Sequence, residues 1–166
     1  YTAMIAVIGR DDLALSATEV GLLMSAEGIG GLIATLTIAF VARPWMHRRI
    51  YVYGLALCLV MVTVFAAMAD PALAGLAVLV AGIGAGGFSA MQSTIILLSA
   101  PREQRGQVLG LLVVCIGAGP IGFLHLGFLA HWLGAAEAVT VIAVEGMVAL
   151  VIARLIWPET TMEDRA

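Results

Sequence analysis

Three ionisable side chains stand in long apolar stretches of this sequence, where little water would solvate them. Glu27 lies in SAEGIGG (25–31), and Glu145 and His125 lie in equally apolar surroundings further along the chain. A charged group in hydrocarbon is costly unless it is neutralised, paired or in contact with water, and such groups often carry protons or bind ions. Glu27, His125 and Glu145 are therefore candidates for proton coupling or substrate binding.

Glu27 has the clearest helical surroundings of the three. At 100° per residue it shares a face with the small residues Gly30, Gly31 and Ala34. Large side chains occupy the opposite face: Leu22, Ile29, Leu32 and Leu36. Small residues let helices approach closely, so this face should point into a bundle. The residue lies about ten positions from the expected helix start, which is a depth of about 15 Å. A neutral, hydrogen-bonded Glu27 with a structural role is the alternative.

The other two candidates have stronger structural alternatives. Glu145 lies on a face of mixed residue size, which favours a structural bond or a contact with another helix. His125 lies beside Ala118 and Gly122, and a lone histidine in such a place is often a hydrogen-bonded packing residue.

A second group of residues could line a substrate path. Gln92 shares a polar stripe with Ser89, Ser93 and Ser99, although serines that bond back to their own helix would fit equally well. Small residues and a proline interrupt the same kind of apolar segment further on, where helix packing and bending are expected: Gly117, Gly119, Pro120 and Gly122.

Composition indicates the elements that position these residues. Hydrophobic residues make up 62% of the 166 residues, charged residues only 11%, and the mean hydropathy is +1.08, which favours a membrane protein. Five apolar stretches are each long enough to cross a bilayer: 17–42, 50–69, 72–99, 106–132 and 135–157. The first nine residues are too short to cross and are expected to be the end of a longer helix. The sequence predicts an all-α transmembrane bundle over 1–157, with a cytoplasmic tail at 158–166.

Arginine predicts the orientation, because the chain contains no lysine. Seven of the eight arginines fall in regions that an alternating topology places on one side of the membrane, and Arg10 falls on the other. Positive residues favour the cytoplasmic side, so the C-terminus should be cytoplasmic. Trp45, Tyr51, Tyr53 and Trp157 would mark the inner interface and Trp132 the outer one.

Other classes of protein fit less well. GFSA around Ser89, followed by His125, is similar to the nucleophile and base of intramembrane serine proteases, but Ala90 replaces the second glycine of that pattern. A membrane scaffold without transport activity would share the composition. Cys58 and Cys115 lack metal-site spacing, and the sequence indicates no cofactor, metal, nucleotide or nucleic-acid site.

Three motifs in order carry a family resemblance. RPWMHRRIYVYG resembles the loop pattern G-x-x-x-D-R-x-G-R-R of major facilitator transporters, PREQRGQVLGLL resembles the start of their eleventh helix, and GAGPIGFLHLGFLAHWLG resembles its continuation. The loop residues concerned are Arg43, Arg48, Arg49, Arg102, Arg105 and Gly106. Ala42 stands where the family has aspartate, which puts a charge-relay role for the first loop in doubt.

The resemblance covers the whole chain and implies the C-terminal half of a twelve-helix transporter, built as a 3+3 inverted repeat. It is closest to prokaryotic drug and siderophore exporters of the inner membrane. It implies a secondary transporter or antiporter that couples the efflux of a small molecule to protons, with an N-terminal half as its partner. No ATP-binding loop is present, so an ion gradient would drive transport.

Overall fold

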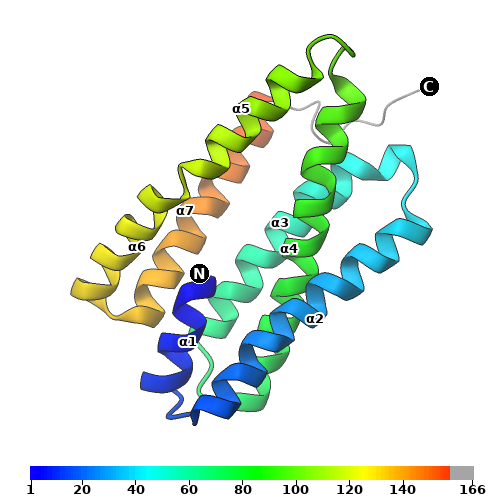
Figure 1. Cartoon of the computed structure of the whole chain (residues 1–166). Coiled ribbons are helices and arrows are strands. Elements are labelled where there is room, and N and C mark those ends of the chain that lie inside the picture. The colour runs from blue at the N-terminus through cyan, green and yellow to red at the C-terminus, as the bar shows by residue number, and fades with distance from the viewer. Residues whose placement is uncertain (158–166) are drawn as a thin grey trace.

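The computed structural model describes residues 1–157, which contain helices and no strand. The predicted all-helical fold class is confirmed, while the predicted tail at 158–166 lies outside the described residues. The elements are α1 (Thr2–Asp11), α2 (Ala17–Val41), the 3₁₀ turn η1 (Pro44–Met46), α3 (His47–Ala66), α4 (Pro71–Ser99), α5 (Arg105–Gly117), α6 (Gly119–Leu133) and α7 (Ala135–Ile156) (Figure 1).

Five segments of the described chain are long and apolar enough to cross a membrane. They are α2, α3 with the preceding turn η1, α4, the consecutive helices α5 and α6, and α7, which match the five predicted stretches. The remaining helix, α1, has 10 residues and packs against α2 and α7. The chain is therefore a multi-pass membrane protein.

Local sequence explains where the helices begin. The Ser16 side chain accepts a bond from the backbone N–H of Glu19, whose carboxylate in turn accepts from the Ser16 N–H at 2.8 Å, so α2 starts with a capping box. Asp70 caps α4 by accepting from the N–H groups of Ala72 and Leu73, both at 2.9 Å. Gly134 joins α6 to α7 with φ of 102°, a conformation that favours glycine.

The stretch predicted as 106–132 is two helices rather than one. The break lies at Ala118, between the end of α5 and the start of α6, with Pro120 in the first turn of α6. Proline has no N–H to donate to the preceding turn and its ring crowds the carbonyl four residues earlier, so the helix bends here. A Cβ added at Gly117, Gly119 or Gly122 would meet no atom within 4 Å, so within the described chain these glycines mediate no close helix contact.

Helix α4 is the centre of the bundle, and its glycines bring it close to two neighbours. A Cβ at Gly82 would overlap the Glu27 carbonyl oxygen of α2, and a Cβ at Gly86 would lie 2.8 Å from the Gly31 oxygen. On the other face, a Cβ at Gly84 would lie 2.5 Å from the Gly54 oxygen of α3. Backbones can approach this closely only without side chains between them.

The loops separate into two groups at opposite ends of the bundle. In Figure 1 the 42–46 connection, the 100–104 connection and the end of α7 lie at one end, and the other three connections lie at the opposite end. Among the described arginines, only Arg10 lies away from the first group. Large apolar side chains cover the outer face of α2, where Leu22 is 67% exposed and Leu32 59%, as expected for a surface in lipid.

The arginine-rich end is predicted to be cytoplasmic. In a variant with Cys58 and Cys115 replaced by serine, a cysteine introduced as His47→Cys or Gln104→Cys should resist membrane-impermeant thiol reagents in intact cells. Asp12→Cys, at the opposite end, should react rapidly and serves as the control. Fast labelling at 47 and 104 with protection at 12 would reverse the orientation.

The contact between α4 and α2 gives a prediction about stability. Gly82→Ala should lower the stability of the detergent-solubilised protein by about 1–3 kcal/mol, because the added methyl group forces the two backbones apart. Gly21→Ala is the matched control, since a Cβ at Gly21 meets nothing within 4 Å. Equal thermal unfolding of the two variants would contradict the close contact.

Candidate functional site

Glu27 lies half-buried between α2 and α1 and is held by two hydroxyl groups. The Tyr1 hydroxyl donates to Oε1 of Glu27 at 2.6 Å, and Oγ1 of Thr2 donates to the same oxygen at 3.1 Å. The Cys58 thiol of α3 lies 3.8 Å from the Tyr1 hydroxyl. A polar chain therefore runs from α3 through the start of α1 to α2.

Sequence reasoning missed Tyr1 and Thr2 as partners of Glu27, although a signal was present. Helices α1 and α2 form an antiparallel pair around the 12–16 loop, and residues at equal distances from the loop lie at equal depth. Tyr1 and Glu27 are each eleven positions from the nearer end of that loop. Comparison of these distances would have predicted that Tyr1 and Glu27 are neighbours.

The backbone of Glu27 is fixed separately from its side chain. The glycine contact with Gly82 holds the Glu27 carbonyl against α4, and Gly30 and Ala34 on the same side of α2 are buried. The small-residue face of α2 thus packs on α4, and the carboxylate extends from the edge of this contact toward α1.

His125 and Glu145 meet across α6 and α7. Nε2 of His125 lies 3.2 Å from Oε2 of Glu145, and the two side chains are 48% and 54% exposed. Both line a cavity of about 530 Å³, together with Tyr1 and the small residues Gly119, Gly122, Gly146 and Ala149. The two residues, which the sequence suggested separately, form one acid–base pair.

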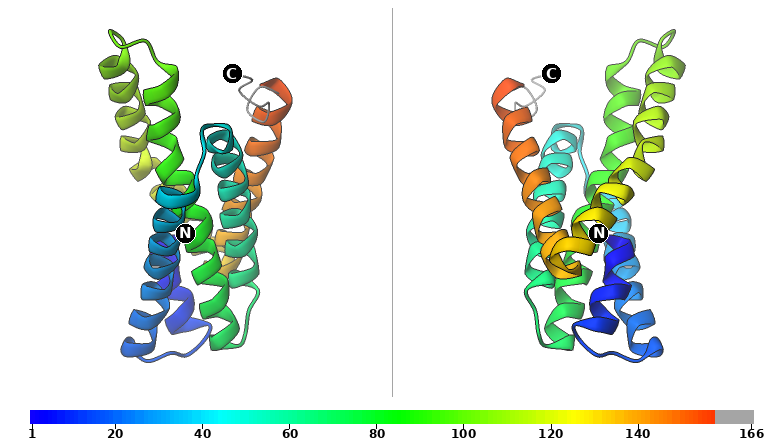
Figure 2. Two further views of the ribbon diagram at one scale, coloured as in Figure 1. Left: turned by 90° about the vertical axis from the view of Figure 1, so that its right-hand side faces the viewer. Right: turned by 90° about the vertical axis from the view of Figure 1, so that its left-hand side faces the viewer.

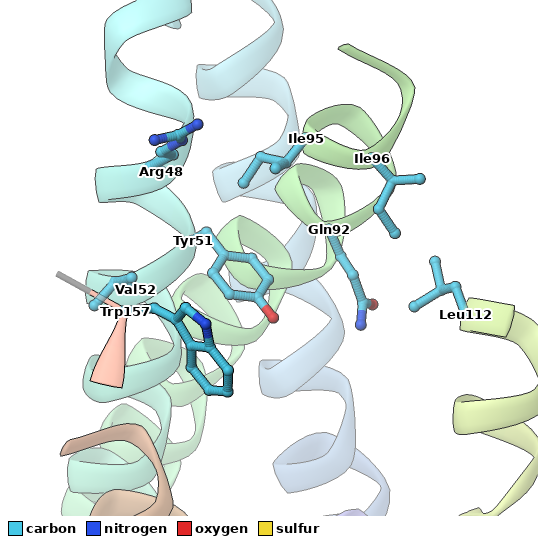
Figure 3. Close-up of a pocket in the computed structure, with 8 residues that line it drawn as sticks. All are labelled: Arg48, Tyr51, Val52, Gln92, Ile95, Ile96, Leu112 and Trp157. Atoms are coloured by element: carbon cyan, nitrogen blue, oxygen red, sulfur yellow. The ribbon is translucent and has the colours of Figure 1, made fainter. Parts of the chain in front are cut away.

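A groove near the arginine-rich end contains Gln92 (Figure 3). It has a volume of about 420 Å³ and lies between α3, α4, α5 and the residue after α7. Its walls combine aromatic and aliphatic side chains with one guanidinium and one amide: Arg48, Tyr51, Val52, Gln92, Ile95, Ile96, Leu112 and Trp157. Such a surface suits a molecule with both apolar and polar parts.

The polar residues predicted to form a stripe on α4 do not all line the same cavity. Ser89 lines a different cavity of about 400 Å³, with Tyr1, Cys58 and residues of α7, and Ser93 is exposed and lines neither. Ser89 and His125 line two different cavities, and His125 lies within hydrogen-bond distance of Glu145. The protease-like pair of hydroxyl and imidazole is therefore not assembled.

The arginine-rich connections form local contacts. Nε of Arg105 donates to the Ala100 carbonyl at 3.2 Å, which joins the end of α4 to the start of α5. The guanidinium of Arg43 lies 5.1 Å from the Trp45 ring centre. Arg48 and Arg49 lie in the first turn of α3, Arg102 is exposed, and a Cβ at Gly106 would meet nothing within 4 Å.

The membrane-crossing helices, with ionisable residues inside them, define a helical membrane protein of the kind that moves solutes or ions. The family model of the Major Facilitator Superfamily matches residues 1–166, so the chain belongs to that family of membrane transporters. No curated protein and no solved structure matches the chain significantly.

Proposed function

We propose that this chain is the C-terminal half of a secondary transporter that exports small molecules in exchange for protons, with Glu27 as the coupling carboxylate. The observation that carries the proposal is the hydrogen bonding of Glu27 at mid-depth by Tyr1 and Thr2. An intramembrane acid is by default a candidate functional site, and its named partners give that candidate a defined geometry.

The partners of Glu27 suit a group that gains and loses a proton. Hydroxyl groups can donate to an ionised carboxylate, and after rotation they can accept from a protonated one. Tyr1 and Thr2 therefore provide hydrogen bonds in both states, whereas amide N–H donors would favour only the ionised state. Exchange with water when the path opens would then release the proton.

The substrate proposal rests on the groove around Gln92. Its apolar walls with a few polar groups are typical of sites for drug-like molecules, which supports a drug or siderophore exporter. The N-terminal half would form the other wall of the path. The arginine distribution supports an inner-membrane protein whose C-terminus is cytoplasmic.

Substitution of Glu27 tests the coupling. In the full-length transporter, Glu27→Gln should reduce pH-driven efflux to the level of empty vesicles at normal expression, because the amide keeps the size but cannot titrate. Glu137→Gln, which changes an exposed acid at the start of α7, is the matched control and should transport like the parent.

Three other outcomes of this experiment have defined meanings. Normal pH-driven efflux of every substrate by Glu27→Gln would end the coupling proposal. Normal efflux by Glu27→Gln together with loss of folded Glu27→Ala would show a structural role. Loss of efflux of cationic substrates alone, with normal efflux of neutral ones, would show that Glu27 recognises the substrate.

The proposal also predicts that residues 1–166 do not transport alone. Alternating access requires one half to move against the other around a central path. Vesicles containing only this chain should show no substrate flux above empty vesicles. Robust flux by a monomeric preparation would contradict the assignment as one half of a transporter.

A further inference from the structure

The cavity between α1, α6 and α7 contains an acid–base pair that the proposed role of Glu27 does not use. His125 and Glu145 lie within hydrogen-bond distance; Glu145 is near the middle of its membrane-crossing segment, and His125 is about two-thirds of the way along its own. The surrounding surface is apolar and rich in glycine. Ionisable residues at such depth face a protein interior or a water-filled cavity, because contact with lipid is costly.

Two ionisable groups within hydrogen-bond distance can share a proton. With one proton between them the pair is neutral overall, either as imidazolium and carboxylate or as imidazole and carboxylic acid. Loss of that proton leaves one negative charge, and gain of another leaves one positive charge. The pair can therefore hold one proton between its two members and exchange it when water reaches the cavity.

Tyr1 connects this cavity with Glu27. Tyr1 lines the cavity of His125 and Glu145, and its hydroxyl donates to Glu27 at 2.6 Å. The cavity volume of about 530 Å³ greatly exceeds the ~30 Å³ that one water molecule occupies, and its polar residues supply partners for water. Water there would complete a hydrogen-bonded path between the two acids.

We propose that the His125–Glu145 pair is a second proton-binding site, joined to Glu27 by the Tyr1 hydroxyl and water in the shared cavity. A proton moves from the pair to a cavity water, and this water passes a proton to the Tyr1 oxygen. In the same step the Tyr1 hydroxyl gives its own proton to Glu27. Tyr1 ends the transfer with one proton, as it began, and rotation of its hydroxyl resets the path.

Few titratable groups of the described chain lie near the His125–Glu145 pair. Among the described residues, α1 contributes Tyr1, and α3 contributes Cys58, which lies against the Tyr1 hydroxyl. No titratable side chain of α5 lines this cavity. The other ionisable residues of α6 and α7, which are His131, Glu137 and Arg154, lie toward the helix ends.

Infrared titration of the full-length protein in phosphatidylcholine vesicles tests the pair. The carboxyl band of Glu145 is assigned by its loss in Glu145→Gln. His125→Asn and His125→Gln should each move the pH at which the Glu145 band titrates, because a proton-sharing partner is removed. His131→Asn, which changes the other histidine of α6, should leave it in place. An unmoved Glu145 titration in folded His125 variants would overturn the proposal.

A double-substitution experiment tests the link to Glu27. Glu145→Gln should move the titration of the Glu27 band, and this effect should disappear when Tyr1→Phe is also present. No effect of Glu145→Gln on Glu27, or an undiminished effect in Tyr1→Phe, would overturn the link. Circular dichroism of each variant serves as the control for retained helical content.

This inference rests on the proposed proton coupling, but the two can fail separately. Transport by Glu27→Gln tests the coupling alone, and the titrations require no transport. If Glu27→Gln abolishes transport but Glu145→Gln leaves the Glu27 titration of the otherwise unchanged protein in place, only the link between the two sites is overturned. If Glu27→Gln transports normally but Glu145→Gln shifts the Glu27 titration through Tyr1, only the coupling role of Glu27 is overturned.

Discussion

Close backbone contact along α4 is the constraint on which the rest of the structure depends. Lipid surrounds the bundle, so burial of apolar surface alone does not bring helices together, and close packing must do so instead. Gly82 and Gly86 face α2, whereas Gly84 faces α3, and each position leaves no space for a side chain. One helix thereby fixes two neighbours.

This packing also determines where polar chemistry can occur. The Glu27 carbonyl lies against α4, so the helix cannot rotate to turn the carboxylate toward lipid. The side chain instead meets hydroxyls from the start of α1, which also borders α7 (Figure 2). A small number of glycines on one helix thus places an acid beside a cavity formed by three others.

Several of these features could be predicted from the sequence because they depend on length or on local spacing. The thickness of a bilayer sets the length of a crossing helix, and caps such as Ser16 and Asp70 mark where helices begin. The 100° periodicity placed Glu27 with Gly30 and Ala34. Pro120 indicated a bend, but not that α5 and α6 would be separate helices.

Contacts between distant helices could not be predicted in this way. The pairing of His125 with Glu145 depends on how α6 crosses α7, which neither helix specifies alone. Gln92 and Ser89 share a polar stripe, yet they line different cavities because α4 meets different neighbours at the two depths. A periodic pattern gives the face of a helix, but not the partner of that face.

The break at Ala118 divides one membrane crossing into two segments with different attachments. Helix α6 packs on α7 and is bonded to it through His125, whereas α5 buries none of its residues. Displacement of α5 would therefore break few packing contacts with the other described helices. Rotation of α5 about Ala118 would leave α6 in place. Such a motion would widen the groove near the arginine-rich end without disturbing the acid–base pair.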